Sequence, residues 1–214
     1  MLSGMQFDAV VFDVGETVLD PSREYQAWAA FFGVPAHTFS AVFGAMIAQG
    51  ATVQAVLERF GSGRSVAELW QQRGGAVRLG ELDLYPDVRP ALAALAGIRG
   101  LQRAIAGNQH ASVAGQLRRL QLDVELLAAS GEWGVAKPDP AFFGRLCQEL
   151  GLPPQRVVYV GDQLDNDVRA PIAAGLAAIR IRRGPWGWLT ADPVLESSAV
   201  AVIDSLLELP ALLS

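Results

Sequence analysis

The sequence predicts an α/β fold in which a doubly wound parallel sheet is interrupted after its first strand by a helical insert. Strand and helix patterns alternate from residue 87 onward, as they do where parallel strands are joined by helical crossovers. Ala9–Phe12 is a short apolar run that is typical of a strand buried on both faces. Four helical patterns without a strand lie between these regions. We therefore expect a core domain over residues 1–20 and 85–214 and a helical domain over residues 21–84.

Hydrophobic periodicity, together with capping and breaking residues, assigns the individual elements. In the insert, helices are predicted at 22–32, 37–49, 52–60 and 65–73. In the core, strands are predicted at 9–12, 102–106, 125–129, 156–160 and 177–181. The core helices are expected at 87–96, 140–150, 167–174 and near 203–207, with one more that ends near 120.

Composition narrows the classes of protein that this chain can belong to. The 214 residues are 51% hydrophobic and 18% charged, which excludes a disordered chain and allows a sizeable core. A net charge of -5 without a Lys/Arg run gives no indication of nucleic-acid binding. The single cysteine, Cys147, is compatible with a reducing compartment.

One segment invites a membrane interpretation, which its polar residues oppose. Tyr25–Leu57 carries no charge, but Pro35 and several polar residues leave no purely apolar run of membrane-spanning length. The first residues also lack a basic segment followed by an apolar one, as a signal peptide would have. We expect a cytoplasmic protein with no membrane and no nucleic-acid partner.

Polar side chains that suit phosphate chemistry follow several predicted strands. Open parallel sheets bind ligands beyond the carboxyl ends of their strands, and Asp13, Asn108, Asp162 and Asp167 lie at or just after such ends. Lys137, the only lysine beside 16 arginines, precedes the predicted helix at 140. Clustered carboxylates repel one another unless a cation joins them, and their oxygens suit Mg²⁺. A strand-end aspartate can also act as a nucleophile that forms an acyl phosphate.

Four motifs resemble those of the haloacid dehalogenase-like (HAD) hydrolase superfamily in order and spacing. They are VVFDVGETVLD at 10–20, AIAGNQ at 104–109, VAKPDPAFF at 135–143 and VYVGDQLDNDVRAPIAAG at 158–175. The resemblance covers almost the whole chain, and the third and fourth motifs are its most specific parts. It implies a Rossmann-like core, a small helical cap formed by the insert, and a hydrolase acting on a small phosphorylated substrate.

The resemblance also implies roles for the matching acidic and basic residues. Asp13 would be the catalytic nucleophile, and Lys137 would hold both the phosphate and that nucleophile. Asp162 would bind Mg²⁺ directly together with Asp13 and the backbone carbonyl of Gly15. Asp167 would support the metal or orient the lysine.

Two further residues would bind substrate by this resemblance, and two positions depart from the family pattern. Thr17 would hydrogen-bond near the nucleophile, and Asn108 would contact the phosphoryl group through its amide. Gly15 stands where phosphatases of the family carry a second aspartate as general acid and base, a function typically worth about 10²–10⁴-fold in rate. Glu16 is the nearest carboxylate, but in an extended segment it would point the opposite way. Gly107 replaces the usual Ser or Thr.

These departures keep other activities open. Metal-independent 2-haloacid dehalogenases of the family also lack the second aspartate. They replace the aspartate that corresponds to Asp162, however, and they use an early cap arginine that Tyr25–Leu57 does not provide. A weakly active or non-catalytic homologue that binds a phosphorylated ligand or a partner is the third alternative.

The residues and the resemblance together favour Mg²⁺-dependent hydrolysis of a small phosphomonoester through an aspartyl-phosphate on Asp13. The uncharged early insert indicates plain packing of a helical core, an uncharged leaving group, or a face for a homodimer.

Overall fold

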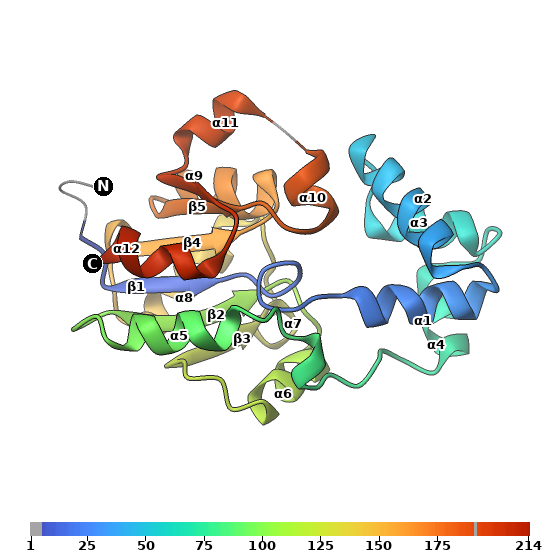
Figure 1. The fold of residues 1–214 in the computed structure, drawn as a ribbon, viewed down its shortest axis with the longest axis horizontal. Helices are drawn as coiled ribbons and strands as arrows, with labels where there is room; N and C mark the ends of the chain where they lie inside the picture. Colours follow the sequence, from blue (N-terminus) through green and yellow to red (C-terminus); the bar gives the residue numbers. More distant parts are fainter. Residues whose placement is uncertain (1–5, 191) are drawn as a thin grey trace.

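The computed structural model describes residues 6–190 and 192–214, and it places a six-stranded sheet at the centre of the larger part of the molecule (Figure 1). Every strand pairs in parallel with its neighbours, in the order β3-β2-β1-β4-β5-β6. The strands are β1 (Ala9–Phe12), β2 (Gln102–Gly107), β3 (Leu126–Ala129), β4 (Val157–Gly161), β5 (Ala177–Ile181) and β6 (Ala201–Ile203). The predicted doubly wound α/β fold is confirmed.

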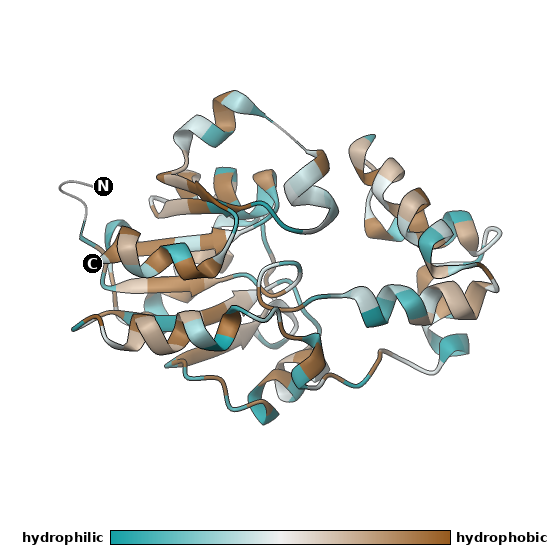
Figure 2. Ribbon diagram, viewed as in Figure 1, coloured by the Kyte–Doolittle hydropathy of each residue, from teal (hydrophilic) through white to brown (hydrophobic). Residues whose placement is uncertain are grey.

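Successive residues of the central strands face two separate hydrophobic layers. Val10 and Phe12 of β1 point into one layer, whereas Ala9 and Val11 point into the other, as strand geometry requires. The first layer is closed by α5 (Val88–Ala96), α6 (Ala111–Arg119) and α12 (Leu209–Leu213), and the second by α8 (Pro140–Leu150) and α9 (Ala170–Ala173). Figure 2 shows the resulting apolar strands between helices of mixed character.

The helices α1 (Ser22–Phe32), α2 (Ala36–Ala48), α3 (Val53–Phe60) and α4 (Val66–Arg73) form a group beside the sheet (Figure 1). They share a hydrophobic cluster of their own, built around Trp28, Phe39, Phe43 and Leu57. The two connections to the core run side by side, with Asp20 N–H donating to the Asp83 carbonyl over 2.8 Å. We retain 21–84 as the expected extent of this domain, and residues 1–5 of the expected core lie outside the described residues.

A short helix of the core touches the helical group directly. It is α10 (Gly184–Leu189), which packs against α2. Trp186 meets Phe43 edge to face, with ring centroids 5.6 Å apart. The group is therefore anchored to the core by this contact as well as by its two connections.

Two predicted core helices differ from the structure. Near 203–207 the chain forms strand β6, which pairs Ala201 with Ile179 of β5, and then a 3₁₀ turn, η4 (Leu206–Glu208). The conformation of such a short apolar segment is decided by whether it pairs with an open sheet edge. Local hydrophobic periodicity carries no information about that pairing. Within the predicted helix at 167–174, the π-helical turn η3 (Leu164–Arg169) precedes the short α9.

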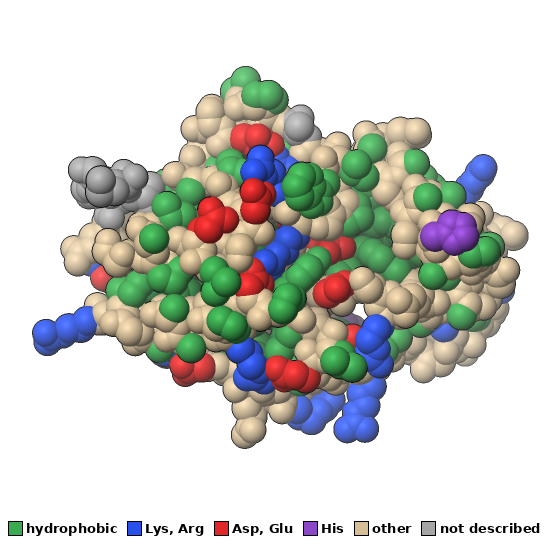
Figure 3. All heavy atoms as spheres, in the orientation of Figure 1, with side chains coloured by type: hydrophobic (Ala, Val, Ile, Leu, Met, Phe, Trp, Pro, Cys, Tyr) green, Lys and Arg blue, Asp and Glu red, His purple; other side chains and the backbone are tan. Residues whose placement is uncertain are grey.

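Four further short elements lie in the connections between the main strands and helices. They are α7 (Ser130–Trp133), α11 (Pro193–Ser198) and the 3₁₀ turns η1 (Glu81–Asp83) and η2 (Pro154–Arg156). Over the described residues no single helix is long and apolar enough to cross a membrane. Among the helices described, only α1 and α2 taken together have the necessary length and apolar character, and these two helices are bent by 108° relative to one another. Basic side chains on the face in Figure 3 are scattered rather than joined in a stripe.

Candidate active site

Three buried carboxylates meet at the carboxyl ends of the central strands. Asp13 directly follows β1, Asp162 directly follows β4, and Asp167 lies in the π-helical turn η3. One oxygen from each lies within 4.8 Å of the others, and the residues are 6%, 0% and 0% exposed. The parallel sheet thus assembles a compact acidic cluster from two distant parts of the sequence.

Lys137 neutralises part of this cluster. Its ammonium Nζ lies 2.6 Å from Asp13 Oδ1 and 2.5 Å from Asp167 Oδ1, and 4.9 Å from the centre of the Tyr159 ring. Burial alone would lower the pKa of Lys137, but the two carboxylates raise that pKa well above its usual value. The lysine is therefore a fixed cation beside Asp13.

Asp162 shows where a metal ion would fit. Both of its carboxylate oxygens are buried and lack a hydrogen-bond partner among the described residues. Burial, followed by the neighbouring charges of Asp167 and Asp13, raises the pKa of Asp162 well above its usual range. Buried carboxylates normally have partners, and a divalent cation ligated by oxygens would supply one. The donor set therefore fits Mg²⁺.

Asp167 is held by groups on both sides. Its Oδ2 accepts a 2.9 Å hydrogen bond from the Gln163 backbone N–H, and its Oδ1 accepts from Lys137. Burial raises the pKa of Asp167 to about 6, and the lysine opposes that rise. Gly161 makes room for it, since a Cβ there would lie 2.4 Å from Asp167 Cγ.

The side chain of Asn108 bonds to the backbone of Lys137. Its Nδ2 donates to the Lys137 carbonyl and its Oδ1 accepts from the Lys137 N–H, both over 2.8 Å. The amide thereby fixes the loop that carries the lysine, while Asn108 also lines the cavity above Asp13. Its predicted contact with a phosphoryl group stays a prediction.

Thr17 is fully buried, and its hydroxyl lacks a hydrogen-bond partner within the described chain. Its carbonyl accepts a 2.9 Å hydrogen bond from Arg183. Thr17 does not line the cavity that contains Asp13, and its predicted role near the nucleophile stays a prediction.

The expectation that Glu16 points away from Asp13 assumed an extended segment, and the segment after Asp13 is not extended. The residue has a φ of 56°, so the chain turns there and the alternation argument does not apply. Its carboxylate accepts hydrogen bonds from the Tyr25 hydroxyl at 3.2 Å and the Tyr85 hydroxyl at 2.6 Å. Burial raises the pKa of Glu16 to about 7, although both hydrogen bonds lower it. Local sequence offers little warning of this turn, since only glycine favours such a φ.

The two unusual glycines differ in the space around them. A Cβ on Gly107 would lie 2.6 Å from Asp13 Oδ1 and 2.9 Å from Val14 Cγ2. A Cβ on Gly15 would meet only Gln109 Nε2, at 3.8 Å. Gly107 therefore makes room for the Asp13 carboxylate beside the strand, whereas Gly15 leaves open space.

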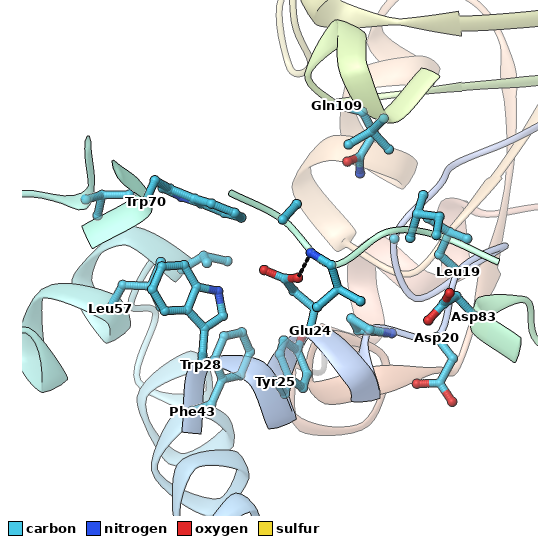
Figure 4. A pocket seen from close by; sticks show the side chains of 18 of the residues that line it. Leu19, Asp20, Glu24, Tyr25, Trp28, Phe43, Leu57, Trp70, Asp83 and Gln109 are labelled. Atoms are coloured by element: carbon cyan, nitrogen blue, oxygen red, sulfur yellow. Dashed lines mark hydrogen bonds between the residues drawn. The ribbon is translucent and has the colours of Figure 1, made fainter. Parts of the chain in front are cut away.

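Two cavities meet beside Gly15. The smaller, of about 230 Å³, contains Asp13, Lys137, Asn108 and Glu16. The larger, of about 320 Å³, lies between the core and α1, α3 and α4, and Figure 4 shows Trp28, Trp70 and Leu57 along it. The two share the residues Gly15, Pro21, Tyr25, Val53 and Gln109. We call them the polar cavity and the apolar cavity.

Comparisons with known proteins place this geometry in a family. A family model described as haloacid dehalogenase-like hydrolase matches residues 7–175. Glyceraldehyde 3-phosphate phosphatase from Methanopyrus kandleri is 36% identical over 104 residues, which are 48% of this chain and 45% of that protein. Phosphoserine phosphatase from Thermus thermophilus is 35% identical over 106 residues, or 47% and 41% of the two chains. The chain thus spans less than half the length of these relatives.

Solved structures agree on the fold. The HAD-hydrolase YfnB from Bacillus subtilis, solved with bound magnesium, superposes with a TM-score of 0.75 at 18% identity, covering 98% of this chain and 99% of that one. L-2-haloacid dehalogenase from Xanthobacter autotrophicus gives a TM-score of 0.68 at 18% identity, with 97% and 98% covered. The family match covers most of the sequence, including β1 and β4 and the aspartates that follow them. The chain therefore belongs to the haloacid dehalogenase-like hydrolases.

Proposed function

We propose that the protein is a Mg²⁺-dependent phosphomonoesterase that uses Asp13 as its nucleophile. The observation that carries the proposal is the buried cluster of Asp13, Asp162 and Asp167 around the Lys137 ammonium. The names of the curated relatives, which include several phosphatases, favour the same chemistry. We further propose that residues 21–84 act as a cap domain over the polar cavity.

Asp13 and Asp162, with the backbone carbonyl of Gly15 and support from Asp167, would hold the metal. Bound there, Mg²⁺ would neutralise charge on the phosphoryl oxygens. Lys137 holds Asp13 by its 2.6 Å contact and offers a second positive charge to the phosphoryl group. Asn108 keeps the lysine in place through its two backbone hydrogen bonds.

The reaction then needs two displacements at phosphorus. A carboxylate oxygen of Asp13 forms a bond to phosphorus, and the bond from phosphorus to the leaving oxygen breaks, with its electron pair going to that oxygen. Water next attacks the aspartyl-phosphate, which releases inorganic phosphate and restores the carboxylate. Because Gly15 offers no side chain, the leaving oxygen takes its proton from water, from Glu16 or from the substrate.

Dehalogenation is the second candidate, and Gly15 is the observation that favours it. Asp162 opposes it, because a metal-independent site has no use for a buried carboxylate with two unpaired oxygens. Nearby cap arginines are also engaged: Arg23 pairs with Asp83 at 2.7 Å, and Arg73 pairs with Glu24 at 2.5 Å. Phosphate ester hydrolysis therefore remains the better supported reaction.

Hydrolysis of p-nitrophenyl phosphate tests the proposal. We expect turnover with Mg²⁺, none in EDTA, and a loss of at least about 10³-fold in Asp13→Asn. Asp123→Asn, at a position whose side chain is 68% exposed and which lines neither cavity, serves as a matched control that keeps full activity. Release of halide from a 2-haloacid without metal, with no phosphatase turnover, would favour dehalogenation instead.

A further inference from the structure

The apolar cavity points to the kind of molecule that leaves the phosphate. We propose, on the basis of the phosphomonoesterase function above, that the substrate is an aryl phosphomonoester whose leaving group is an uncharged aromatic ring seated in the apolar cavity. Glyceraldehyde 3-phosphate and phosphoserine, the small polar esters that appear in the names of two curated relatives, would then be poor substrates for this protein.

The walls of the apolar cavity are aromatic and aliphatic. Trp28, Phe43 and Leu57 belong to the buried cluster of the helical group, and Trp70 packs edge to face on Trp28 with ring centroids 5.0 Å apart. Figure 4 shows these side chains gathered along one end of the cavity. Flat aromatic walls of this kind bind a ring by area burial and by edge or stacked contacts.

Several polar side chains of the same cavity are hydrogen-bonded within the protein. Glu24 accepts from Arg73 and, over 3.0 Å, from the Val77 backbone N–H. Gln116 accepts from the Leu79 backbone N–H over 2.8 Å. Among the described residues that line the cavity there is no lysine or arginine. A leaving group that carries a carboxylate would face acidic neighbours, because Arg73, which lies 4.0 Å from the centre of the Trp28 ring, is already paired with Glu24.

The position of Gly15 connects the cavity to the nucleophile. Gly15 lines both cavities, and a Cβ added to it points toward Gln109, which also lines both. A side chain at position 15 would therefore project into the junction. Its absence gives a ring attached to the phosphoryl oxygen a path from the polar cavity into the apolar one.

The absence of a carboxylate at position 15 favours the same class of substrate. When Asp13 displaces the leaving oxygen from phosphorus, the electron pair stays on that oxygen. A phenolic oxygen tolerates this charge, since a phenol such as that of tyrosine loses its proton near a pKa of about 10. A simple alcohol is, like water, a far weaker acid than a phenol, so its oxygen needs a proton donor when it leaves. Cavity chemistry and the lack of a carboxylate at position 15 thus both favour aryl esters.

A substrate series with a pair of cavity variants tests this proposal. The substrates are 2-naphthyl phosphate, phenyl phosphate, phosphoserine and acetyl phosphate, of which the last is activated but has no ring. We expect kcat/KM for 2-naphthyl phosphate to exceed that for phenyl phosphate about tenfold through a lower KM, because more apolar surface is buried. Phosphoserine should be at least about 10³-fold slower than phenyl phosphate.

The variant Ala76→Trp fills the apolar cavity from an exposed loop position that lines it. Ala67→Trp places the same bulk at an exposed position of α4 that does not line it. We expect Ala76→Trp to lower the ratio of kcat/KM for 2-naphthyl phosphate over acetyl phosphate at least tenfold, and Ala67→Trp to leave that ratio unchanged.

The outcomes separate the two proposals. If acetyl phosphate is hydrolysed in an Asp13-dependent manner but phosphoserine matches phenyl phosphate, or Ala76→Trp leaves the ratio unchanged, the aryl assignment is wrong and the phosphomonoesterase function stands. If no phosphate in the series is turned over, the phosphomonoesterase function itself fails. Circular dichroism of Ala76→Trp confirms that a lost ratio does not reflect unfolding.

Discussion

Replacing Lys137 by methionine tests whether the lysine holds three buried carboxylates together. The change keeps the volume of the side chain but removes the ammonium that lies 2.6 Å from Asp13 and 2.5 Å from Asp167. Removing one partner of a buried ion pair typically costs about 3–5 kcal/mol. At about 2–4 °C per kcal/mol for a chain of this size, the Tm in EDTA at pH 7 should fall by about 6–20 °C.

The pH dependence of that loss distinguishes charge repulsion from lost packing. Burial and like charge raise the folded-state pKa of Asp162 well above its usual range and that of Asp167 to about 6. A carboxyl whose pKa is raised by folding contributes its full stability below the unfolded pKa and loses it as pH rises through the folded pKa. Without Lys137 these pKa values rise further, so the difference in Tm from wild type should shrink at pH 5 and widen toward pH 8.

Thermal melts in EDTA from pH 5 to pH 8 measure both effects. Arg145→Met is the matched control, because Arg145 and Glu149 are 53% and 36% exposed in their side chains and form a surface pair, worth less than about 1 kcal/mol. A Tm for Lys137→Met within 2 °C of wild type, or a deficit that is the same at pH 5 and pH 8, would refute the reasoning.

Three more substitutions test the residues around Asp13. A Cβ on residue 15 would lie 3.8 Å from Gln109 Nε2, so the site has room for a side chain there. Gly15→Asp should raise kcat/KM on alkyl phosphates by about 10²-fold by adding a proton donor; no gain would mean that protonation of the leaving group does not limit the rate. Gly107→Ser should lower kcat by about 10²-fold, because its Cβ would lie 2.6 Å from Asp13 Oδ1 and displace the nucleophile; an unchanged kcat would show that the carboxylate can yield. Burial raises the pKa of Glu16 to about 7, so ionisation of Glu16 should cost the wild-type protein about 2–3 kcal/mol of stability between pH 4.5 and pH 7 in EDTA. Glu16→Gln should not show this loss; equal slopes of Tm against pH for the variant and the wild type would count against it.

The central sheet and the acidic cluster at its edge could be predicted because their signals are local. The runs Ala9–Phe12 and Val157–Gly161 are apolar, and an aspartate directly follows each of them. Parallel topology brings the carboxyl ends of such strands together. Confirmation of the fold therefore also explains why Asp13 and Asp162 meet. The order of the strands needed the structure, since register and neighbour choice depend on contacts far apart in the sequence.

The parts that the sequence did not reveal depend on tertiary contacts. Strand β6 forms because an open sheet edge accepts it, and its three residues carry too little periodicity to distinguish strand from helix. Glu16 faces Tyr25 and Tyr85 because the chain turns at a positive φ. The apolar cavity arises between elements that are distant in sequence. The uncharged segment Tyr25–Leu57 was compatible with core packing, an uncharged leaving group or a dimer face, and it did not reveal a cavity that meets the Asp13 cavity at Gly15.

The central claim is that Asp13 carries the phosphoryl group during turnover. The most direct measurement is acid quenching of the enzyme during hydrolysis of p-nitrophenyl phosphate, followed by peptide mass spectrometry of the segment that contains Asp13. The account predicts a phosphorylated Asp13 with Mg²⁺ present and an unmodified peptide in EDTA or in Asp13→Asn. Steady release of phosphate by wild-type enzyme and Asp13→Asn alike, with no modified peptide, would contradict it.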